Sequence, residues 1–293
     1  MNLLPPALLQ KLGRSRLAVR RVMAATGIGE RRSRAIGSGM EFADHRTYQF
    51  GDDIRKLDPH LLARLGRHYV RQYTVQQALA VTILIDTSRS MFFGQPAKIE
   101  FARSLAAGIA YTGLSGGDQV LVGAFSDGKV HWHPRLQGAA RTATLMNWLG
   151  RLKAAGDSDL SQAVRAALPR IGTTEGLTVI ISDWFVEGIP RALTALRASN
   201  QEVLAVQVLA PDELEPERLG AGDVRLRDAE SGHEIETTLD PGLQQRYREK
   251  LESWTQELRD QIVGKEGRFV RVRSDDDLER LFIRDWRHEG LIG

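Results

Sequence analysis

Residues 78–85 read ALAVTILI and are followed directly by Asp86-Thr87-Ser88-Arg89-Ser90-Met91, and this stretch decides the fold. The apolar run is short, nearly continuous and rich in β-branched residues, which is typical of a strand buried on both faces of a parallel sheet. The residues that follow it bring a carboxylate and two hydroxyls into one tight loop. We therefore expect a central strand with a polar site at its carboxyl end.

The remaining elements alternate around this strand. Helical spacing or helix signals occur at 97–114, 141–154, 160–171 and 189–198, and strand patterns occur at 120–125, 129–132, 177–182 and 203–209. Farther on, the pattern indicates a hairpin over 224–227 and 234–238, a charged helix over 242–263, a strand over 268–272 and a helix over 276–286. This order predicts an α/β fold, a doubly wound, mostly parallel sheet with helices on both faces and an antiparallel hairpin at one edge.

The 293-residue chain carries its charge unevenly. Residues 1–77 hold 14 Lys and Arg against 6 Asp and Glu, whereas the rest of the chain holds 26 against 31. We therefore expect two parts, an irregular basic N-terminal segment over 1–77, with a Gly- and Ser-rich loop within 14–40, and the α/β domain over 78–293. The basic segment leaves nucleic-acid binding open as an alternative function.

Composition limits the chemistry and the location. There is no Cys, so thiolate nucleophiles, Cys-ligated metals and disulfides are excluded, and a reducing cytoplasm is the expected location. The longest apolar run falls far short of the roughly 20 residues that span a bilayer, so we expect no membrane span. The chain also contains no Walker A sequence, H-E-x-x-H or dinucleotide fingerprint.

Polar residues follow the strands where an open α/β sheet binds ligands, beyond the carboxyl ends. Asp86, Ser88 and Ser90 follow the first strand, Asp183 follows the strand at 177–182, and Ser158 precedes a helix between them. All are hard oxygen donors with no His or Cys among them, which favours Mg²⁺ or Mn²⁺. Mg²⁺ takes six oxygen ligands, so a position stays open for an incoming carboxylate.

These residues resemble the metal-ion-dependent adhesion site of von Willebrand factor A-like domains. Asp86, Ser88 and Ser90 match its Asp-x-Ser-x-Ser element and Asp183 its last Asp, while Ser158 stands where Thr is usual. The resemblance implies that these five residues bind the metal and that a Glu or Asp of a partner protein completes its coordination. It implies a protein-interaction module and not an enzyme.

A second resemblance lies upstream. The stretches GSGMEF at 37–42, RTY at 46–48, GDDIRKLD at 51–58 and AR at 63–64 are similar to the bacterial family called domain of unknown function 58, in which they lead into the Asp-x-Ser-x-Ser-Met strand. Pro59 stands where that family usually has Trp. The resemblance implies an accessory protein to a MoxR-type AAA+ ATPase, with a role in assembling or activating other proteins.

Two alternatives remain open at this point. An Asp at the end of the first strand is also found in Mg²⁺-dependent phosphoester hydrolases, but those have Asp-x-Asp-x-Thr, and Ser88 replaces their general-acid carboxylate. The polar segment Gly51–Asp58 is either a structural turn, with Arg46 or Arg55 paired to Asp, or a contact surface for a partner.

Overall fold

The computed structural model describes residues 3–19, 40–75, 78–153, 155–220, 222–227 and 233–293. It forms two compact units, one made of residues 1–27 and 79–293 and the other of residues 28–78. Within the described residues, no helix is both long and apolar enough to cross a membrane. The expected Gly- and Ser-rich loop falls largely on residues 20–39, which lie outside the described part.

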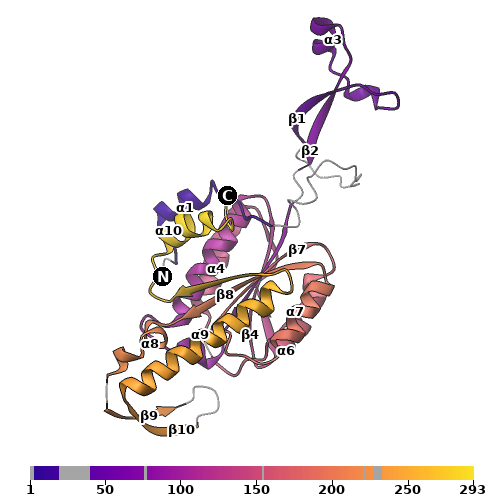
Figure 1. The fold of residues 1–293 in the computed structure, drawn as a ribbon. Coiled ribbons are helices and arrows are strands. Elements are labelled where there is room, and N and C mark those ends of the chain that lie inside the picture. The colour runs from indigo at the N-terminus through magenta and orange to yellow at the C-terminus, as the bar shows by residue number, and fades with distance from the viewer. Residues whose placement is uncertain (1–2, 20–39, 76–77, 154, 221, 228–232) are drawn as a thin grey trace. The chain divides into compact units, whose positions relative to one another are not determined.

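The larger unit is built on a mostly parallel sheet (Figure 1). The strand order is β11-β8-β7-β3-β4-β5, and the short strand β6 also pairs with β4. The α/β fold class predicted from the sequence is confirmed. Antiparallel pairing is confined to β5 and β6, which both pair with β4, so the hairpin lies at one edge as expected. The strands are β3 (Ala80–Asp86), β4 (Gln119–Ser126), β5 (Lys129–Trp132), β6 (Leu136–Gln137), β7 (Gly176–Ser182), β8 (Gln201–Leu209) and β11 (Arg268–Arg273).

Helices cover both faces of this sheet (Figure 1). Val81, Ile83 and Ile85 of β3 belong to one apolar cluster, whereas Leu84 belongs to the other. The first cluster includes residues of α1 (Pro6–Leu12), α4 (Lys98–Ser115), α5 (Thr142–Arg151) and the C-terminal segments η5 (Leu281–Asp285) and α11 (Trp286–His288), and Leu278 of α10 (Leu278–Arg280) packs against it. The second includes residues of α6 (Leu160–Ile171), α7 (Ile189–Ala198) and α9 (Pro241–Val263).

Short elements complete the larger unit. A separate antiparallel hairpin is formed by β9 (Gly222–Arg227) and β10 (Glu234–Leu239), as the sequence predicts. Single turns of helix occur at η2 (Arg89–Phe92), η3 (Ala139–Arg141), α8 (Pro211–Leu214) and η4 (Pro216–Leu219).

The first residues of the chain pack on this larger unit. Leu4, Leu8 and Leu12 are fully buried in the same cluster as α4, and the backbone N–H of Arg16 donates to the carbonyl of Gly293. The structure therefore groups residues 1–27 with the α/β unit, a different division from the expected boundary at residue 77.

The sequence predicts an irregular segment over residues 1–77, but the smaller unit contains regular secondary structure. Its antiparallel hairpin pairs β1 (Met40–Thr47) with β2 (Tyr69–Val75), and the connection holds η1 (Ile54–Lys56) and α3 (Pro59–Leu65). Asp58 caps α3, because its Oδ1 accepts from the N–H groups of His60 and Leu61. Pro59 then occupies the first helical position, where its missing N–H costs nothing.

Candidate metal site

The strand order reverses at β3, which has β4 on one side and β7 on the other. Open α/β sheets bind ligands beyond the carboxyl ends of the strands at such a point. Asp86 is the last residue of β3 and is fully buried. Its Oδ1 accepts from the N–H of Ser88 at 2.9 Å, which bends the chain so that the Oγ atoms of Ser88 and Ser90 lie 3.0 Å apart.

Two further hydroxyls reach the other oxygen of the same carboxylate. Ser158, from the loop before α6, donates to Asp86 Oδ2 at 3.1 Å, and Ser182, the last residue of β7, donates to it at 2.7 Å. Asp183 follows Ser182 and is fully buried. The structure thus links Asp86, Ser88, Ser90 and Ser158 by hydrogen bonds and places Asp183 beside them.

Backbone hydrogen bonds hold the surrounding loops together. The N–H of Arg89 donates to the carbonyl of Gly156 at 3.0 Å, and the N–H of Ala155 donates to the carbonyl of Thr87 at 2.7 Å. The loop with Ser158 is also tied to the β4–β5 turn, because the N–H of Asp157 donates to Asp127 Oδ1 at 2.9 Å. The hydroxyl donors therefore sit on loops that are fixed to one another.

Trp184 fixes the turn that carries Asp183. Its backbone has a φ of 66°, a left-handed conformation that large side chains rarely adopt, and its side chain is fully buried. The indole Nε1–H donates to the carbonyl of Val206, and the backbone N–H donates to Ser182 Oγ. The next N–H, that of Phe185, donates to Asp183 Oδ1 at 3.1 Å. Packing thus holds a strained turn at the site.

A buried cation, unexpected from the sequence, lies next to these residues. The ammonium of Lys98, at the start of α4, lies 2.8 Å from Asp183 Oδ2 and 2.6 Å from Glu213 Oε1, and its side chain is 1% exposed. Burial lowers the pKa of Lys98, but the charges of Asp183 and Glu213 outweigh that effect and raise it. Lys98 therefore remains an ammonium.

The carboxylate charges at the site exceed this single cation. Asp86, Asp183 and Glu213 are three buried or nearly buried carboxylates, and the Lys98 ammonium contacts Asp183 and Glu213 but not Asp86. Burial, and after it the charge of Asp183, raises the pKa of Asp86 to about 6. A divalent cation between Asp86 and Asp183 would balance the remaining two negative charges.

The side-chain oxygens at the site are suitable ligands for such an ion. In the part of the chain that the structure describes, no three His, Cys, Asp or Glu side chains form a group that could hold a metal. A metal at Asp86 and Asp183 would therefore need the hydroxyls of Ser88, Ser90 and Ser158 as ligands. Two carboxylates and three hydroxyls fit the hard cations Mg²⁺ and Mn²⁺.

Neighbouring acidic residues have other roles. Asp159 caps α6, because its Oδ1 accepts from the N–H of Gln162 at 3.0 Å, and the side chains of Asp157 and Glu187 are exposed. Sequence reasoning missed Ser182, Lys98 and Glu213. Ser182 precedes Asp183 at a strand end, a signal that was available, but nothing in the sequence pairs Lys98 with a carboxylate 115 residues away.

The upstream polar segment forms the turns of the smaller unit. Arg46 pairs with Asp52 at 2.8 Å, and the other oxygen of Asp52 accepts from the N–H of Gln49. Asp53 accepts from the N–H of Arg55 and caps η1. These contacts account for the Asp and Arg side chains by turn chemistry, the structural interpretation of this segment.

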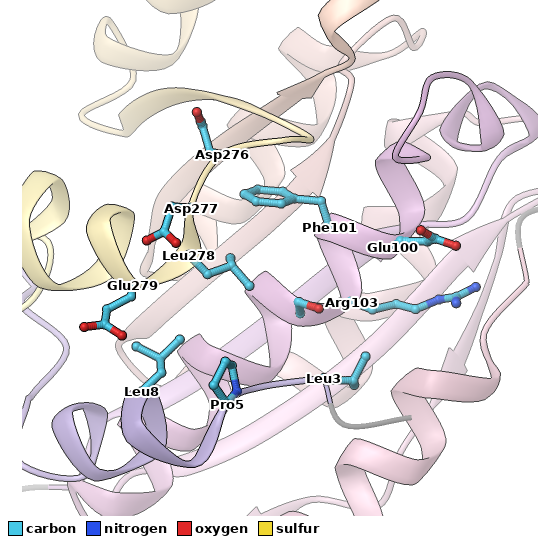
Figure 2. A pocket seen from close by; sticks show the side chains of 11 residues that line it. Leu3, Pro5, Leu8, Glu100, Phe101, Arg103, Asp276, Asp277, Leu278 and Glu279 are labelled. Carbon is cyan, nitrogen blue, oxygen red and sulfur yellow. The ribbon is translucent and has the colours of Figure 1, made fainter.

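A cavity of 430 Å³ lies elsewhere, between α1, α4 and the residues that lead into α10 (Figure 2). Its lining combines apolar side chains such as Leu8 and Phe101 with the charged side chains of Glu100, Arg103 and Asp277. None of the five predicted metal ligands lines it, so the candidate site is not this cavity.

Comparisons with known proteins place the chain in a family. Uncharacterized protein Rv1480 of Mycobacterium tuberculosis is 30% identical over 249 residues, 82% of this chain and 77% of that protein, and uncharacterized protein Mb1516 of Mycobacterium bovis matches equally well. BatB of Bacteroides thetaiotaomicron matches 73% of this chain and 98% of that structure at 19% identity and a TM-score of 0.46. The structure of a von Willebrand factor type A protein from Catenulispora acidiphila matches 76% of this chain and 44% of its own chain, at 14% identity and a TM-score of 0.42. The family model "Protein of unknown function DUF58" matches residues 44–259, and the chain therefore belongs to the DUF58 family.

Proposed function

We propose that this protein is an interaction module that binds a divalent cation, Mg²⁺ or Mn²⁺, at the carboxyl end of β3, and that the ion binds a carboxylate of a partner protein. One observation carries the proposal. The side chains of five residues with oxygen donors, Asp86, Ser88, Ser90, Ser158 and Asp183, lie together at the end of β3, and among the described residues the cation beside the carboxylates of Asp86, Asp183 and Glu213 is the Lys98 ammonium, which contacts the last two. A divalent cation relieves that imbalance and suits those donors.

Each residue has a defined role in the proposal. The hydroxyls of Ser88, Ser90 and Ser158 bind the ion directly, and Asp86 and Asp183 hold it directly or through water. Lys98 contacts Oδ2 of Asp183, whereas Oδ1 accepts one hydrogen bond from the N–H of Phe185 and keeps a lone pair for the ion. The ion supplies positive charge and an open coordination position, which hydroxyls and carboxylates alone could not offer to an incoming carboxylate. The proposal assigns no chemical step to the protein.

Calorimetric titration with Mg²⁺ tests whether the protein binds the metal. Affinity capture from the native lysate, in Mg²⁺ and in EDTA, tests whether the bound metal is needed for partner binding. We expect Mg²⁺ to bind the wild type, and proteins to be captured in Mg²⁺ but not in EDTA. Asp86→Ala should abolish both effects with the fold intact. Asp157→Ala, which removes an exposed carboxylate of the adjoining loop, is the matched control and should change neither. Capture that persists in EDTA and in Asp86→Ala would contradict the proposal.

The proposed partner is a MoxR-type AAA+ ATPase or its client, which this protein would help to assemble or activate in the cytoplasm. The similarity of the segments at 37–64 to the DUF58 family supports the ATPase, and the absence of Cys supports a reducing compartment. Mass spectrometry of the captured proteins tests the partner. An AAA+ ATPase retained in Mg²⁺ alone is the expected result, and a set of nucleic-acid-associated proteins retained in both lanes would favour the basic N-terminal segment as the binding surface.

A further inference from the structure

Three phenylalanines are exposed beside the candidate metal site. Phe92 and Phe93 follow the Ser88–Ser90 loop and are 55% and 43% exposed, and Phe185, two residues after Asp183, is 41% exposed. Phe50 of the smaller unit is exposed as well. Exposed apolar side chains that gather beside polar groups mark interaction surfaces, and aromatic rings are enriched in the buried centres of interfaces.

The rings of Phe93 and Phe185 form one patch on the Asp183 side of the site, and the exposed Phe92 is next to Phe93 in the chain. The ring centroids of Phe93 and Phe185 lie 6.0 and 5.9 Å from Lys98 Nζ, so two separate segments of the chain meet over the buried ammonium. The ring of Phe185 also packs against Trp254 of α9, and the two ring centroids are 4.8 Å apart. We call Phe92, Phe93, Phe185 and Trp254 the aromatic patch.

The opposite side of the site is polar. Ser158 is preceded by the exposed Asp157, which is tied to the β4–β5 turn at the exposed Asp127. Apolar surface therefore borders the site on one side and carboxylates border it on the other.

We propose that the partner binds through a segment in which a Glu or Asp side chain completes the metal and a bulky apolar residue next to it covers the aromatic patch. This inference rests on the proposed function and adds to it that the partner residue next to the Glu or Asp is bulky and apolar. The metal attracts the acidic side chain, and burial of exposed rings against an apolar side chain adds affinity that a carboxylate alone cannot supply. The carboxylates near Ser158 disfavour a second acidic residue on the other side.

Short blocked peptides test this recognition directly. The probes are acetyl-Leu-Phe-Glu-Gly-Gly-amide, the Gly-flanked acetyl-Gly-Gly-Glu-Gly-Gly-amide, and acetyl-Leu-Phe-Gln-Gly-Gly-amide, which lacks the carboxylate. Each is titrated into the full-length protein, labelled with ¹⁵N, in Mg²⁺ and in EDTA, and dissociation constants are taken from amide shifts. We expect the apolar Glu peptide to bind at least about tenfold more tightly than the Gly-flanked one, and both to lose binding in EDTA.

A double variant, Phe92→Ser with Phe185→Ser, tests the patch. Both side chains are exposed, and the hydrogen bond from residue 185 to Asp183 uses the backbone N–H, so the variant should fold and bind Mg²⁺ like the wild type. It should bind the two Glu peptides equally. Phe50→Ser removes an equally apolar and more exposed ring from the smaller unit and should keep the full preference.

The outcomes separate this inference from the proposed function. Equal dissociation constants for the two Glu peptides, with binding lost in EDTA, would overturn the aromatic patch and leave the metal-dependent function standing. A preference that persists in the double variant would also overturn the patch. Failure of both Glu peptides to bind in Mg²⁺, or equal binding of the Gln peptide, would overturn the role of the metal and the inference with it.

Discussion

The Lys98 ammonium and Asp183 form a buried ion pair, with 2.8 Å between Nζ and Oδ2 and side chains 1% and 0% exposed. Asp183 is also a predicted metal ligand, so the ammonium and a bound metal ion would act on one carboxylate. Lys98 reduces the free-energy cost of burying that carboxylate, and the same positive charge repels a divalent cation. We therefore expect Lys98 to stabilise the metal-free protein and to weaken metal binding.

The variant Lys98→Met tests both effects, since Met keeps most of the length without the charge. Asp183 and Glu213 would lose their shared cation, and breaking a buried ion pair costs roughly 3–5 kcal/mol. The free energy of unfolding in EDTA should fall by about that amount, as measured by urea denaturation. Mg²⁺ affinity, from calorimetric titration, should rise by about tenfold, so the stability gained on adding Mg²⁺ should grow.

Two variants serve as controls for Lys98. Glu213→Gln removes one negative charge and should therefore lower the Mg²⁺ affinity. Lys11→Met removes an exposed lysine that pairs with Glu279 and should change neither quantity. Weaker Mg²⁺ binding in Lys98→Met would contradict the electrostatic argument and would mean that Lys98 chiefly holds Asp183 in place.

Lys98 illustrates where sequence reasoning stopped. The strand runs and the order of helices and strands were predictable, because buried parallel strands are nearly continuous apolar runs. The rule that ligands bind at the carboxyl ends of strands then predicted that Asp86, Ser88, Ser90 and Asp183 lie near one another, and the resemblance to the adhesion site added Ser158. A lysine at the start of a helix looks solvated in sequence, and its two carboxylates come from the ends of β7 and from α8, so their meeting depends on the sheet order.

The first 77 residues show a similar limit. Leu8 and Leu12 recur at helical spacing, with Leu4 just before the helix, and this signal of the buried face of α1 could have been used. The β1–β2 hairpin was harder to predict, because its strands are joined by a long connection that itself contains η1 and α3. Charge counting grouped these residues as one basic segment, although α1 and the hairpin belong to different compact units.

The variant Asp86→Asn tests whether the buried charge serves the metal or the fold. Burial and the charge of Asp183 raise the pKa of Asp86 to about 6, so its ionised form at neutral pH is unfavourable where it stands. The neutral, nearly isosteric Asn should raise the free energy of unfolding in EDTA at pH 7 by roughly 1–3 kcal/mol, measured by urea denaturation. The same variant should lose calorimetric Mg²⁺ binding. Lower stability in EDTA would show that the charge is required by the fold.

The pKa of Asp52 should report its hydrogen bonds with Gln49 and Arg46. Its pKa lies below the usual value, first because its carboxylate accepts from the N–H of Gln49 and then because it accepts from Arg46. A carboxyl with a lowered pKa in the folded state adds stability above its unfolded pKa, and this stability is lost as the pH falls through the folded value. In ¹³C NMR titrations, Arg46→Ala should raise the Asp52 pKa toward the unperturbed value, and an unchanged pKa would contradict the ion pair.

Gly156 is expected to be required for the shape of the Ser158 loop. Its φ is 80°, and a Cβ there would lie 2.2 Å from the Asp127 carboxylate, the same side chain that accepts from the N–H of Asp157. Gly156→Ala should therefore displace the loop, lower the free energy of unfolding by roughly 1–3 kcal/mol, and weaken calorimetric Mg²⁺ binding.

Gly117, with a φ of 87° and no atom within 4 Å of an added Cβ, is the matched control. Gly117→Ala should cost only the backbone strain of about 1–2 kcal/mol and leave Mg²⁺ affinity unchanged, because it lies at the other end of β4. Equal Mg²⁺ affinity in the two variants would mean that the position of Ser158 does not contribute to metal binding.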